Sequence, residues 1–74
     1  MTLWVTFGVD PGLSGAVVTL IDGEPGPMLD MPVLKCGDSN EVDAIALAKF
    51  VREVRSQHPG AYVTACIERV RAMP

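Results

Sequence analysis

The chain has 74 residues, of which 49% are hydrophobic and only 5% aromatic, so its core must be built from aliphatic side chains. This length allows at most one small domain, near the lower limit for independent folding, and we expect either a homo-oligomer or part of a larger protein. The net charge of −3 excludes a globally basic nucleic-acid-binding surface. No apolar stretch reaches the ~18 residues that a membrane span needs.

The two cysteines predict no special chemistry. Cys36 and Cys66 lie far apart and form no Cys-x-x-Cys motif. A disulfide framework or a zinc site is therefore not expected, and both residues are expected to be free thiols. The N-terminus lacks the basic segment and following apolar segment of a secretory signal. We therefore expect a cytoplasmic chain without a membrane partner.

The first predicted element is a strand that ends in a carboxylate. Leu3–Val9 is β-branched and aromatic enough to form a strand buried on both faces, and it ends at Asp10. Pro11–Ser14 turns the chain, and Gly15–Ile21 is predicted to return as an antiparallel strand. A carboxylate at the mouth of a buried strand is costly unless a hydrogen-bond donor or a metal ion holds it. Alternatively, Asp10 is an ordinary turn residue whose side chain caps backbone N–H groups.

The next segment is predicted to complete a three-stranded meander. Asp22–Pro27 has the glycines and prolines of a turn. Met28–Leu34 is predicted as a third strand, and Pro32 assigns it to a sheet edge because proline has no N–H to donate.

A helix is predicted over Glu41–Gln57, with Asp38 as its cap and Glu41 as the partner in a capping box. The apolar residues recur at steps of three and four and form one stripe: Ala46, Leu47, Phe50, Val51 and Val54. Lys49, Arg52 and Arg55 are interpreted as a solvated face. Ile45 lies among the polar residues, so we expect part of that face to be covered by material that this chain lacks. His58–Gly60 ends the helix.

Ala61–Ile67 is predicted as a fourth strand, buried on both faces because it is almost entirely apolar. Since it follows a helix, a right-handed crossover places it parallel to an earlier strand, for which the first strand is the natural choice. The predicted architecture is an α/β domain over residues 1–74, with a mixed sheet of order 3-2-1-4 and one crossover helix.

This topology brings two acidic residues to one edge of the sheet. Asp10 and Glu68 are each the first acid after an apolar strand, and neighbouring strands are ~4.8 Å apart. Two carboxylates that close repel each other, and Mg²⁺ would remove the repulsion. The alternative is that Glu68 is only the solvated end of a strand, paired with Arg69 or Arg71.

The motifs resemble those of a known family. Phe7–Gly12 and Ala65–Glu68, in this order and spacing, resemble the first half of the RuvC-type Holliday-junction resolvases of the ribonuclease H-like superfamily. Asp30–Pro32 and Ile67–Pro74 resemble segments of the phage and prophage relatives in particular. The resemblance covers essentially all 74 residues, and its opening motif also occurs across the wider superfamily.

The resemblance implies a ribonuclease H-like fold, cut before its later strand and helices, and a structure-selective DNA endonuclease. Asp10 and Glu68 would be its first two catalytic acids, holding two Mg²⁺ ions ~4 Å apart, with Mn²⁺ as a substitute. The family's further acids lie later, so we expect half an active site and an inactive fragment. Branched DNA is the implied partner of the full protein. Arg69 and Arg71 would then contact phosphates, or else form solvated surface.

Two other classes remain open at this stage. The actin-like ATPases and sugar kinases share this strand topology, and in them an Asp-x-Gly turn meets nucleotide phosphates. Asp10–Gly12, with Ser14 and Gly15, has the residues for that role, although no adenosine-binding region is present and the fourth strand ends in Glu. The third class is a non-catalytic prophage remnant that persists as an oligomer with an exposed sheet edge.

Overall fold

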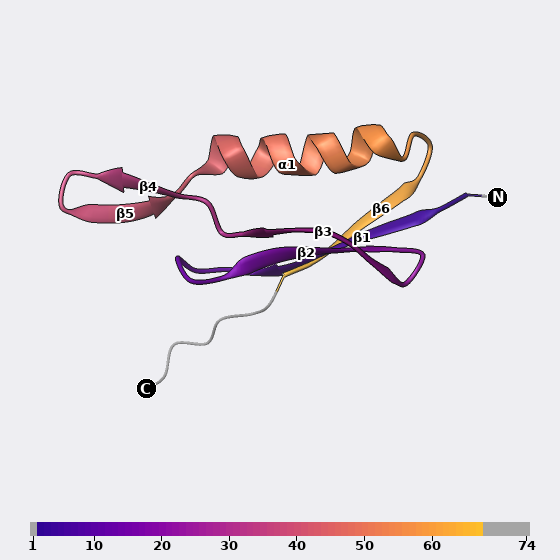
Figure 1. Cartoon of the computed structure of the whole chain (residues 1–74), viewed down its shortest axis with the longest axis horizontal. Helices are drawn as coiled ribbons and strands as arrows, with labels where there is room; N and C mark the ends of the chain where they lie inside the picture. The colour runs from indigo at the N-terminus through magenta and orange to yellow at the C-terminus, as the bar shows by residue number, and fades with distance from the viewer. Residues whose placement is uncertain (1, 68–74) are drawn as a thin grey trace.

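The computed structural model describes residues 2–67 and consists of a sheet with one helix on one face, together with a separate hairpin (Figure 1). The sheet has the order β3-β2-β1-β6. Its strands are β1 (Trp4–Asp10), β2 (Ala16–Ile21), β3 (Glu24–Asp30) and β6 (Tyr62–Ile67). β2 is antiparallel to both β1 and β3, whereas β6 is parallel to β1. The predicted α/β class, strand order and parallel pairing are confirmed, with β6 as the predicted fourth strand.

The core lies between the helix and the two central strands. Val5 and Phe7 of β1 and Val17 of β2 are buried together with Val54 of the helix and Met31. Along β1 the buried residues alternate with half-buried ones such as Thr6, because successive side chains of a strand point to opposite faces. The prediction that the first strand is buried on both faces is therefore wrong, since the helix covers only one of them.

Helix α1 (Ala44–Gln57) packs through the predicted stripe. Val54 is buried, Leu47 and Val51 are half-buried, and the Phe50 ring meets the Phe7 ring edge-on at a centroid distance of 6.5 Å. The opposite side is open to solvent, where Ile45 is 79% exposed.

The start of the helix differs from the prediction. Its N-cap is Asp43, whose carboxylate accepts a hydrogen bond of 3.0 Å from the backbone N–H of Ala46. The predicted capping box of Asp38 and Glu41 instead lies in a hairpin formed by β4 (Val33–Cys36) and β5 (Ser39–Val42). Backbone pairing across this hairpin satisfies N–H and C=O groups that the predicted first helical turn would have used.

The boundaries of the second turn and of the third strand also differ from the prediction. β3 begins at Glu24, so the predicted turn over Asp22–Pro27 shrinks to two residues, Asp22 and Gly23, both with positive φ. The Asp22 carboxylate accepts a hydrogen bond of 2.7 Å from the backbone N–H of Trp4, which fixes this tight turn to β1. The predicted third strand ends early, at Asp30, because its last residues belong to the β4–β5 hairpin.

β6 differs most from its prediction. All six of its residues are exposed, including Val63 at 41% and Ile67 at 67%, although the sequence predicted burial on both faces. The physical reason is the position of α1, whose buried and half-buried side chains join the core residues of β1 and β2. β6 thus lies in the sheet with no buried side chain on either face.

Candidate functional site

Asp10 is the last residue of β1 and is exposed to solvent. β1 and β6 are parallel neighbours, so their C-terminal ends lie at the same edge of the sheet, where ligands of parallel strands tend to bind. The last pair of their register is Val9 with Ile67. Glu68, Arg69 and Arg71, the other predicted site residues, lie outside the described residues 2–67.

The turn after Asp10 holds the backbone of that residue closely. The Gly15 N–H donates a hydrogen bond of 3.2 Å to the Gly12 carbonyl oxygen, which closes the turn. A Cβ atom on Gly15 would lie only 1.8 Å from the Asp10 carbonyl oxygen, so no side chain fits at this position. The Gly15 carbonyl oxygen also accepts a hydrogen bond of 2.9 Å from the Met31 N–H. The position of Asp10 is thus set by backbone packing.

The Asp10 side chain differs in its hydrogen bonding from the side chains of Asp22 and Asp43, which lie next to other regular elements. The carboxylates of Asp22 and Asp43 each accept a hydrogen bond from a backbone N–H. The side-chain hydrogen bonds found within residues 2–67 do not include the Asp10 carboxylate, and its turn closes through backbone groups. Within residues 2–67, the structure therefore shows no backbone N–H capped by the Asp10 carboxylate, whereas the turn interpretation predicts such a cap.

A second acid, Asp30, lies two strands away from Asp10 in the same sheet. Ala16 of β2 pairs with Asp10 on one side and with Asp30 of β3 on the other, so two strand spacings, about 9.6 Å, separate the acids. Within residues 2–67, no group of three or more His, Cys, Asp or Glu side chains is placed to hold a metal ion. Of the predicted site residues, the described part of the chain contains Asp10.

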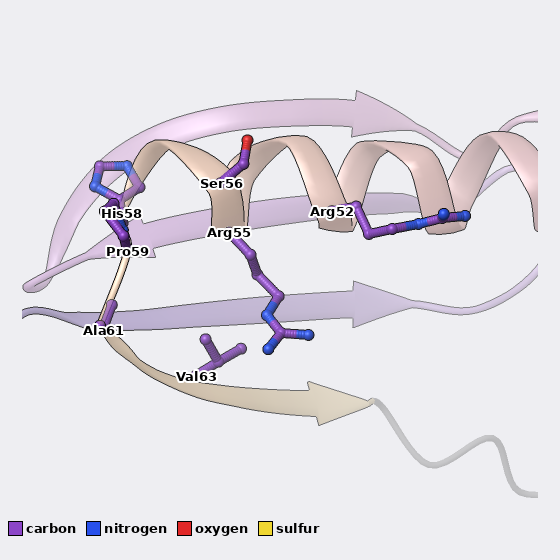
Figure 2. Close-up of a pocket in the computed structure, with 8 residues that line it drawn as sticks. Arg52, Arg55, Ser56, His58, Pro59, Ala61 and Val63 are labelled. Atoms are coloured by element: carbon purple, nitrogen blue, oxygen red, sulfur yellow. The ribbon is translucent and has the colours of Figure 1, made fainter.

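A hollow of about 320 Å³ lies at the other end of the sheet, where α1 passes into β6 (Figure 2). Arg52 and Arg55 line it from the helix, and no acidic residue does. Figure 2 shows the Arg55 side chain extending from α1 toward Val63. Val63 pairs with Val5, five residues before Asp10, so the hollow and Asp10 are about 16 Å apart along the strand. Both arginines were predicted to be solvated, and no motif of the sequence indicated a hollow.

Comparison of the chain with protein-family models, with curated proteins and with solved structures found no match. Within the described residues, no helix is both long and apolar enough to cross a membrane. Any assignment of function to this chain therefore depends on its residues and their geometry.

Proposed function

We propose that this chain is the N-terminal part of a Mg²⁺-dependent, structure-selective DNA endonuclease with a ribonuclease H-like fold, similar to the RuvC-type resolvases. The observation that carries the proposal is the parallel pairing of β1 with β6 up to Val9 and Ile67. Asp10 and Glu68 are the residues that follow this last pair in the sequence. At a strand spacing of ~4.8 Å, two carboxylates that continue the register come close enough to share one cation.

The chemistry of Asp10 fits a hard divalent ion. Its carboxylate is exposed, is not used in the turn, and supplies the oxygen ligands that Mg²⁺ prefers. When bound, Mg²⁺ would lower the pKa of a coordinated water and offset the negative charge of a phosphodiester. The contribution of the protein is to hold the Asp10 backbone in place, which the close packing of Gly15 against the Asp10 carbonyl does.

The sheet order with a crossover helix supports a ribonuclease H-like fold, but the actin-like ATPases share this topology. The two classes differ in substrate, so activity on DNA separates them. In a gene product that carries this chain at its N-terminus, we expect Mg²⁺-dependent cleavage of a four-way DNA junction. Stabilisation by ATP without cleavage would instead favour the ATPase class.

Two substitutions make this test specific. Asp10→Asn keeps the shape of the side chain but removes its charge, and we expect it to reduce cleavage by more than about 100-fold, the upper end of the effect of substituting outer-shell groups. The matched control is Asp30→Asn, which makes the same change two strands away. Asp30 pairs with the same residue of β2, Ala16, as Asp10 does. Equal losses in the two variants would contradict the proposed role of Asp10.

The 74-residue chain itself is expected not to cleave DNA, because it would hold only half of the acids of such a site. Incubation of the purified chain with the same junction and Mg²⁺ tests this expectation. Cleavage that Asp10→Asn abolishes would show that the site is complete within 74 residues, contrary to the half-site proposal.

A further inference from the structure

The hollow where α1 passes into β6 has the size and the charge of a site for a small anion. Its volume of about 320 Å³ is at the low end of the range of about 300–1,000 Å³ that ligand pockets occupy. The polar side chains that line it are those of Arg52, Arg55, Ser56 and His58, and no carboxylate does. The hollow therefore carries two positive charges with no negative charge beside them.

Positive charge gathers on α1 although the chain as a whole is acidic. Of the Lys and Arg side chains in residues 2–67, all but Lys35 lie on this helix, and the only acid of the helix is Glu53. Glu53 does not line the hollow. Because the net charge of the chain is −3, this helix is the part of residues 2–67 to which an anion is drawn.

The Arg55 guanidinium is not used to hold the fold together. Arg55 lies in the last turn of α1, where a cation often bonds the last carbonyl groups of a helix. Figure 2 instead shows its side chain leaving the helix toward Val63 of β6. Neither arginine of the hollow takes part in the side-chain hydrogen bonds found within residues 2–67. The donors of both guanidinium groups are thus available to a ligand.

We propose that this hollow binds a phosphate group, held mainly by Arg55 and also by Arg52. The two residues are three apart on α1, so their Cβ atoms are ~5–6 Å apart, and both side chains are exposed. Figure 2 shows the Arg52 side chain lying along the helix, from where it can turn toward an anion held by Arg55. A guanidinium group donates two parallel N–H bonds to phosphate oxygens, which makes arginine well suited to this ligand.

The charge of the hollow favours an anion over an apolar cover. An apolar segment laid over Arg52 and Arg55 would bury two charges without partners, which is costly. A phosphate group neutralises these charges and accepts their hydrogen bonds. The source of the phosphate follows from the proposed nuclease function, on which this step rests: it is the DNA backbone. The distance of about 16 Å between the hollow and Asp10 corresponds to about five base pairs.

Titration of the 74-residue chain with inorganic phosphate tests the site. In solution NMR, with EDTA and at constant ionic strength, we expect saturable shifts of the amide signals of residues 56–63. Arg55→Gln should raise the dissociation constant at least about tenfold, whereas the matched control Lys35→Gln, which removes one charge from the hairpin, should change it less than twofold. Acetate, with its single charge, should bind more weakly. Absence of saturable shifts, equal effects of the two variants, or an equal affinity for acetate would overturn the proposal.

A second titration identifies the source of the phosphate. A four-way DNA junction, again in EDTA, should shift the same amide signals. Arg55→Gln should reduce the slope of log K against log salt concentration by about one, and Lys35→Gln should leave it unchanged. Shifts with inorganic phosphate but not with the junction would support the site and overturn DNA as its source. Neither titration contains a divalent metal or measures cleavage, so failure of the nuclease proposal would leave the phosphate result unchanged.

Discussion

Substitution of Gly15 tests whether backbone packing fixes Asp10. The Cβ of an alanine there would lie 1.8 Å from the Asp10 carbonyl oxygen and 2.9 Å from its carbonyl carbon, whereas ordinary contact begins at 3.4 Å. Because these are backbone atoms, neither can rotate away, and the nearer contact must lengthen by 1.6 Å, from 1.8 to 3.4 Å. The turn must therefore open, which strains the hydrogen bonds of Gly15 with Gly12 and with Met31.

The expected magnitude follows from these two effects. Forcing an extra carbon into a packed site costs about 1–3 kcal/mol. Each of the two strained hydrogen bonds contributes about 0.5–1.5 kcal/mol. We therefore expect Gly15→Ala to lower the free energy of unfolding by about 3 kcal/mol, a large fraction of the stability of a small domain.

Urea unfolding followed by far-UV circular dichroism measures this free energy. The matched control is Gly37→Ala, where φ is +62° but no atom lies within 4 Å of the added Cβ. Conformational strain alone costs about 1–2 kcal/mol there. The packing argument is refuted if Gly15→Ala is no more destabilising than Gly37→Ala.

Two further substitutions test the fold away from this turn. Thr19 is buried at 2% exposure and its hydroxyl has no hydrogen-bond partner among residues 2–67, so Thr19→Val should raise the free energy of unfolding by about 1 kcal/mol; a lower melting temperature would show that the hydroxyl is satisfied. Asp43→Ala should lower the free energy of unfolding by about 1 kcal/mol through loss of the helix cap, whereas Asp38→Ala in the hairpin should change it by less than about 0.5 kcal/mol. A larger loss of stability in Asp38→Ala than in Asp43→Ala, measured by chemical denaturation, would instead support the helix start predicted from the sequence.

The strand order was predictable because the sequence carries clear signals for it. The Pro11–Ser14 turn, the apolar stripe ending at Val54, and the handedness of crossovers together specify β2 beside β1 and β6 on its other side. Each of these signals is local, or depends on a rule with few exceptions. The chain could thus be assigned to the α/β class before its structure was known.

The errors arose where two local signals compete or where burial depends on a distant element. Asp38 and Asp43 are both good helix caps, and only the pairing of β4 with β5 decides between them. An apolar strand such as β6 is equally consistent with a covered or an open position, because its sequence does not say where α1 packs. For the candidate site, the sequence predicted the edge at which Asp10 lies, whereas the close approach of Gly15 emerged only from the backbone path.

The most direct test of the central claim is Mn²⁺-induced broadening of the amide signals of the 74-residue chain in solution NMR. Mn²⁺ takes the same oxygen ligands as Mg²⁺ and broadens the signals of nearby nuclei. We predict selective broadening around Asp10 and its turn, lost in both Asp10→Asn and Glu68→Gln but retained in Asp30→Asn. Broadening that persists in Asp10→Asn, or that centres on Asp30, would contradict a divalent-metal site shared by the ends of β1 and β6.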